Sequence, residues 1–199
     1  MGISASLALL PALAVTVTGV LLIVLRARRR RMVVLGIQYL CVAWLVTLDL
    51  PMGVALARLT AGVVATAILS VSVLSVQREA VGAGVSGRQP HALTWVAGGL
   101  VGVACLALGS SGWGGLPGVG RATTIGSTAL LGLGLLQVGM ADTSLRVGLG
   151  LLTAVSGFEL VYGELEPSLA VTALLGSVHI GIALVVSYLL RGLPADGEE

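Results

Sequence analysis

The sequence has no lysine, a single phenylalanine and only 10% charged residues. A retinal Schiff base requires a lysine amine, so a seven-helix opsin is excluded. Both cysteines, Cys41 and Cys105, fall within apolar stretches and predict neither a disulfide nor a metal site. The chain also lacks a Walker motif, an HExxH motif and histidine pairs at haem-ligating spacing. We therefore expect no catalytic centre, no cofactor and no bound metal, and we predict that the chain is not an enzyme.

The sequence is instead rich in apolar residues. Hydrophobic residues make up 56% of its 199 positions, and the mean hydropathy is +1.05. A soluble domain has a charged share nearer to a quarter, because its surface faces water. This composition predicts an integral membrane protein surrounded by membrane lipids, with no nucleic-acid partner.

The apolar residues gather in runs of about 20, the length that a helix needs to cross about 30 Å of hydrocarbon. Backbone groups in lipid must be hydrogen-bonded within the protein, which favours helices for these runs. We therefore predict an all-α polytopic membrane protein with about seven transmembrane helices, near residues 3–25, 32–49, 52–76, 92–109, 122–141, 146–162 and 167–190.

The arginines predict the orientation. Nine of them fall in segments on one side of the predicted membrane, while the opposite side has only Arg121 in its loops, together with Glu164 and Glu166. Loops rich in arginine stay in the cytoplasm. We expect a multi-pass protein of the cell (inner) membrane, with the N-terminus outside and the C-terminus in the cytoplasm. The nine are Arg26, Arg28, Arg29, Arg30, Arg31, Arg78, Arg88, Arg146 and Arg191.

The two halves of the chain resemble each other. Residues 31–69 and 145–184 each have an arginine at the inner edge, continue through a helix containing Leu-Gly, and reach a proline before a long final helix. On that final helix, small residues recur four apart, a spacing that lets helices approach closely in lipid. The matching rows are Ala57, Ala61, Ala65 and Ala173, Ser177, Gly181.

This likeness predicts a 3+1+3 parallel internal repeat, in which an odd helix links two three-helix units. The linking helix carries Gly98 and Gly102, a GxxxG pair. We expect the following organisation: 1–76, a first three-helix repeat; 77–121, the linking helix and its loops; 122–191, a second repeat; 192–199, a cytoplasmic acidic tail.

Five polar residues within or beside the spans are candidates for an ion path or for structural polar contacts: Arg58, Glu159, His179, Asp49 and Gln38. An arginine at the depth of Arg58 normally pairs with an acid, and Asp49 and Glu159 lie at matching depth; the alternative is that Arg58 extends to the outer surface. His179 shares a helical stripe with small and polar residues that fits either a proton path or a simple buried hydrogen bond. Glu164 and Glu166 are expected in a short turn that ends at Pro167.

The segment LRVGLGLLTAVSGFELVYGELEPSLAVTALLGSVHIGIALVVSYLL resembles the small three-helix K-type membrane subunit of respiratory complex I. The likeness lies in an Arg-flanked second helix, a GxE-like acid, a short outer turn and a long third helix. The whole chain is similar in length and hydropathy to component E of the multisubunit energy-converting hydrogenases. K-type subunits have mid-membrane acids on both core helices; here Glu159 is nearer the outer edge, and His179 stands roughly where the second acid would be.

The resemblance implies a non-catalytic membrane subunit that packs beside larger polytopic subunits in a complex-I-like or hydrogenase-like assembly. Its role would be structural, with Arg58, Glu159 and His179 lining part of a path for proton translocation or for cations. The alternative function is a stand-alone small-solute secondary transporter, which the architecture also allows.

Overall fold

The computed structural model describes residues 2–25, 27–48, 50–79, 91–111 and 118–191. Within these ranges the chain is all-helical, which confirms the predicted fold class, and it forms no strand. Seven helices follow one another along the described residues: α1 (Gly2–Val24), α2 (Arg28–Val46), α3 (Met52–Glu79), α4 (His91–Ser110), α5 (Arg121–Gly139), α6 (Ser144–Leu165) and α7 (Leu169–Arg191).

Five of the helices, α3 to α7, are long and apolar enough to cross a membrane. The apolar part of α1, Leu9–Val24, is shorter, and α2 begins with four arginines. These helices are compatible with a multi-pass membrane protein. The predicted count of seven spans and the internal repeat go beyond this result and stay predictions.

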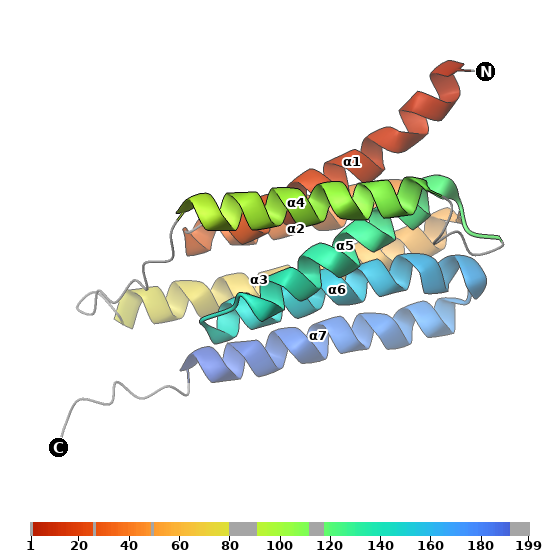
Figure 1. Cartoon of the computed structure of the whole chain (residues 1–199). Helices are drawn as coiled ribbons and strands as arrows, with labels where there is room; N and C mark the ends of the chain where they lie inside the picture. Colours follow the sequence, from red (N-terminus) through yellow and green to blue (C-terminus); the bar gives the residue numbers. More distant parts are fainter. Residues whose placement is uncertain (1, 26, 49, 80–90, 112–117, 192–199) are drawn as a thin grey trace.

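The helices form two layers that pack face to face (Figure 1). One layer contains α1, α2 and α3, the other α5, α6 and α7, and within each layer consecutive helices are neighbours. Across the layers, α1 packs on α5 and α3 packs on α7, while α2 touches α6 more lightly. Helix α4 covers one edge, against α1 and α5. This arrangement encloses the inner faces of α2, α3, α6 and α7.

Exposed aromatic side chains lie near both ends of the bundle. Trp44 and Tyr162 are exposed near the C-terminal ends of the parallel helices α2 and α6. Trp95 and Tyr188 are exposed toward the other end, at the start of α4 and the end of α7. Tryptophan and tyrosine prefer the two membrane–water interfaces, so this distribution fits helices that cross a bilayer.

Helix α6 is longer than the sequence predicts. Glu164 lies in its last turn and not in the expected loop, so that prediction was wrong. The reason is a tertiary hydrogen bond: the carboxylate of Glu164 accepts the backbone N–H of Gly120, the residue that precedes α5, at 2.6 Å. Pro167 does not begin α7 either, because the helix starts two residues later, at Leu169. Glu159 therefore lies about 9 Å from the end of α6, at 1.5 Å per residue.

Glycines bring α5 and α6 into backbone contact. A Cβ at Gly134 would lie 2.5 Å from the amide nitrogen of Ala154, and a Cβ at Gly157 would lie 2.8 Å from that of Leu131. No side chain fits at such distances, so the two helices meet through bare backbone. This close pair fixes the position of α6, which carries most of the polar groups described below.

The two predicted rows of small residues have different surroundings. In the α3 row, Ala65 is fully buried and Ala61 faces Gly176 of α7. In the α7 row, Ala173 and Ser177 are exposed. The row on α7 therefore faces outward in this chain, because α7 turns a different stripe, centred on Gly176 and His179, toward α3 and α6.

Candidate functional site

A polar layer crosses the bundle between two apolar clusters. It contains three predicted residues, Arg58, Glu159 and His179, all buried, together with Ser156 and Thr172. One cluster lies toward the predicted cytoplasmic end and includes Leu22, Met32, Leu35, Leu69, Val73, Leu145, Leu149, Leu152 and Val186. The other lies toward the opposite end and includes Ala12, Val15, Val42, Leu45, Val46, Val54, Ala55, Ile125, Leu130 and Leu160. The polar groups are thus shielded from both ends of the bundle.

The centre of the layer is a contact between Glu159 of α6 and His179 of α7. The Nδ1 atom of His179 lies 3.2 Å from Oε1 of Glu159, and the two side chains are only 2% and 8% exposed. The same Nδ1 lies 3.2 Å from the backbone carbonyl of Leu175, one turn earlier on α7. With Glu159 ionised, Nδ1 faces two acceptors, so it carries a hydrogen and donates toward them. A carboxylate at this depth is stabilised by this donor, since a lone buried charge is costly.

The other ring nitrogen of His179 contacts Ser156. Its Nε2 lies 3.2 Å from Oγ of Ser156, and Ser156 Oγ lies 2.8 Å from the carbonyl of Leu152. The hydroxyl has one hydrogen, so it donates either to Leu152 or to Nε2. In the first case Nε2 must carry a hydrogen and the ring is a charged imidazolium; in the second the ring is neutral. Rotation of one hydroxyl therefore lets the pair exist with or without an extra proton.

Arg58 of α3 contacts the main chain of Glu159. Its Nη2 donates to the backbone carbonyl of Glu159 at 2.6 Å, and the residue is buried. The sequence predicted that Arg58 is buried against Asp49 or Glu159. The residue is buried and contacts Glu159, through the main-chain carbonyl and not the carboxylate. Glycine at position 163 creates the space, because a Cβ there would lie 2.9 Å from Cζ of Arg58 and closer still to Nη2.

Tyr39 and Gln38 of α2 close the layer. The Tyr39 ring meets the His179 imidazole edge-on, with ring centres 5.8 Å apart, and it fits because Gly62 of α3 has no side chain in its way. Gln38 is buried, and its Nε2 donates to Oγ1 of Thr153 at 3.3 Å.

A cavity of about 10 Å³ lies among these groups, lined by Tyr39, Val42, Arg58, Ala61, Ser156, Glu159, Thr172, Gly176 and His179. This volume is about what a single water molecule needs. Two nitrogens of Arg58, Nε and Nη1, are buried and have no hydrogen-bond partner among the described residues. The lining can therefore bind one water molecule, and a solute larger than water does not fit in this conformation.

The sequence predictions for this site were incomplete in two respects. Asp49, the second candidate partner of Arg58, lies outside the described residues. The pairing of Glu159 with His179 and the role of Ser156 were not predicted. A signal was present for Ser156, since Thr153, Ser156 and Glu159 recur three residues apart and so share one face of α6.

Among the described residues, no group of three histidine, cysteine or acidic side chains is arranged to hold a metal ion. Comparison with protein families, curated proteins and solved structures finds no match to this chain.

Proposed function

We propose that this chain is an integral membrane subunit of an ion-translocating assembly of the complex-I-like or energy-converting hydrogenase-like class, and that Glu159 and His179 hold and pass on a proton within it. The observation that carries the proposal is the buried contact between these two side chains at 3.2 Å. Ionisable residues inside membrane helices are rare, and they mark ion pathways and proton relays more often than packing sites.

The pair has two protonation states. In one, both ring nitrogens of His179 carry a hydrogen and the imidazolium faces the carboxylate of Glu159; in the other, Nε2 has lost its proton and the neutral ring accepts from Ser156. The proton that leaves Nε2 would pass to a water molecule in the adjoining cavity, which Ser156 also lines. Arg58, held on the carbonyl of Glu159, keeps a positive charge beside the acid in both states. A water molecule in the adjoining cavity would connect the carboxylate to Tyr39 and Thr172. Histidine suits this role because its unperturbed pKa of about 6.5 lets the side chain gain or lose a proton near neutral pH.

The exposed row of small residues on α7 supports a role as a subunit. Ala173 and Ser177 are exposed, and a Cβ at Gly181 would meet nothing within 4 Å. Helices associate in lipid through such rows, so α7 offers a close-packing face to a larger polytopic partner. The alternative of a small-solute transporter is weaker, because the buried cavity has room for no more than about one water molecule.

The internal repeat is part of this proposal, and contacts between the layers support it. Gln38 bonds Thr153 and Ser72 bonds Ser187, in each case across 115 residues. Ala61 meets Gly176 at the same separation. A constant separation on two different helix pairs is expected if two similar three-helix units stack with equivalent helices facing each other. Seven spans with the N-terminus outside, in the inner membrane, complete the proposed topology.

The test of the subunit role is gentle extraction of the affinity-tagged native protein from its own membrane. We expect larger polytopic proteins to be recovered with it in a fixed ratio that persists when the detergent is changed. Recovery of an isolated monomer or homodimer that moves a solute into liposomes would contradict the subunit role and favour the transporter.

A further inference from the structure

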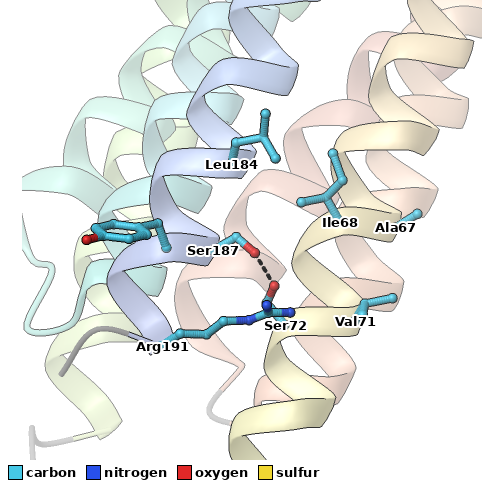
Figure 2. Close-up of a pocket in the computed structure, with 8 residues that line it drawn as sticks. Ala67, Ile68, Val71, Ser72, Leu184, Ser187 and Arg191 are labelled. Atoms are coloured by element: carbon cyan, nitrogen blue, oxygen red, sulfur yellow. Dashed lines mark hydrogen bonds between the residues drawn. The ribbon is translucent and has the colours of Figure 1, made fainter. Parts of the chain in front are cut away.

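A groove runs along the surface where α3 and α7 meet, near the end of the bundle that the arginine distribution predicts to be cytoplasmic (Figure 2). Its volume is about 540 Å³, within the range of sites that bind small organic molecules. The lining residues are Ala67, Ile68, Val71 and Ser72 of α3, and Leu184, Ser187, Tyr188 and Arg191 of α7. This groove is separate from the polar layer around Glu159.

The groove has an apolar part and a polar end. Ile68, Val71 and Leu184 form apolar walls, and a hydrogen bond between the hydroxyls of Ser72 and Ser187 joins the two helices. Arg191 follows Ser187 by one helical turn, so both lie on the same face of α7, and Figure 2 shows the arginine side chain extending toward Ser72. The groove changes from apolar to cationic along the helix axis. A membrane lipid likewise changes along its length, from an apolar acyl chain to a polar headgroup.

Arg191 is exposed and forms no salt bridge with any residue that the structure describes. Tyr188, which lines the same groove, is 76% exposed, as expected for an aromatic residue at the membrane–water interface. The polar end of the groove therefore lies at headgroup level. A guanidinium at that level binds phosphate oxygens with two parallel hydrogen bonds.

From these observations we propose that the groove binds an anionic phospholipid, with one acyl chain between α3 and α7 and the headgroup phosphate on Arg191. A phosphatidylglycerol-type lipid has the required chemistry: an apolar chain for Val71 and Leu184, and a negative charge for the arginine. Basic pockets between membrane helices on the cytoplasmic side select anionic headgroups in this way.

The test uses the full chain, delipidated in detergent, and counts bound lipid by native mass spectrometry. Phosphatidylglycerol and phosphatidylcholine of identical acyl chains are compared at equal concentration. We expect a preference for phosphatidylglycerol that Arg191→Gln reduces about fivefold. The matched control is Arg121→Gln, which removes an exposed arginine at the opposite end of the bundle and should leave the preference unchanged.

A second variant tests whether lipid binding needs the groove itself and not only the positive charge of Arg191. Ala67→Phe fills the groove without altering any charge, and because Ala67 is exposed the fold should survive, as a melting curve without lipid would verify. Binding of both lipids should fall in this variant. Unchanged lipid counts in Ala67→Phe, or equal losses in Arg191→Gln and Arg121→Gln, would overturn the proposal. A photo-crosslinking residue placed at Val71 gives a further test in native membranes. Capture of a protein and of no phospholipid would also overturn the proposal.

Discussion

Replacing Gly163 by alanine tests the position of Arg58 directly. A Cβ at this position would lie 2.9 Å from Cζ of Arg58 and closer still to Nη2, so the guanidinium must move. The movement breaks the hydrogen bond to the carbonyl of Glu159, and a hydrogen bond of a charged group contributes about 1.5–3 kcal/mol. Alanine in a helix interior regains about 1 kcal/mol over glycine. The difference is a net destabilisation of about 0.5–2 kcal/mol.

The sign of this effect should reverse when Arg58 is absent. In an Arg58→Ala background the new methyl group has space, so Gly163→Ala should stabilise the protein by about 1 kcal/mol, the helix-propensity gain alone. Gly181→Ala is the matched control in the wild-type background, because a Cβ there meets nothing within 4 Å and should also stabilise.

The assay is equilibrium unfolding of the purified protein in mixed dodecyl sulfate and maltoside micelles, followed by circular dichroism. The wild type, the two single variants Arg58→Ala and Gly163→Ala, and the double variant form a cycle that gives the coupling free energy between positions 58 and 163. Gly181→Ala gives the stabilisation that comes from helix propensity alone. Equal stabilities of Gly163→Ala and Gly181→Ala, or the same effect of Gly163→Ala with and without Arg58, would refute the argument.

Three further predictions concern the topology and the packing. In a cysteine-free background, Arg29→Cys should label with impermeant reagents only from the cytoplasm and Glu166→Cys only from outside; labelling of both from one side contradicts the seven-helix topology. Gly134→Ala should lower the free energy of unfolding by about 1–3 kcal/mol, because the atoms it meets are backbone and cannot rotate away; a wild-type melting curve would refute the α5–α6 contact. Glu164→Gln should cost about 1 kcal/mol through a weaker bond to the Gly120 amide, and a larger effect of Glu166→Gln in the same assay would contradict that assignment.

Much of the fold could be predicted from the sequence because apolar runs of membrane length have few alternatives to helices. The predicted bounds failed mainly at the outer end of α6. There, the acidic residues before Pro167 are typical of a loop, yet the helix continues through Glu164, whose carboxylate accepts a hydrogen bond from the amide of Gly120, 44 residues away. A contact of this kind has no local signature.

The site could be predicted in part, for a similar reason. Burial of Arg58 near Glu159 follows from depth and charge alone. The contact between Glu159 and His179 depends on how α7 is rotated against α6, and the small-residue row on α7 did not predict that rotation, since Ala173 and Ser177 are exposed. In lipid both faces of α7 are apolar enough to be exposed, so composition does not determine which face packs inward.

Proton movement through the purified native assembly tests the central claim most directly. The assembly is reconstituted into liposomes, a membrane potential is imposed with potassium and valinomycin, and proton uptake is followed with a pH-sensitive dye. With assembly and partner ratio unchanged, Glu159→Gln should slow uptake about tenfold or more, since a neutral amide no longer stabilises the imidazolium of His179, while Glu166→Gln on the exposed end of the same segment should not. Uptake by Glu159→Gln at the wild-type rate would contradict the account.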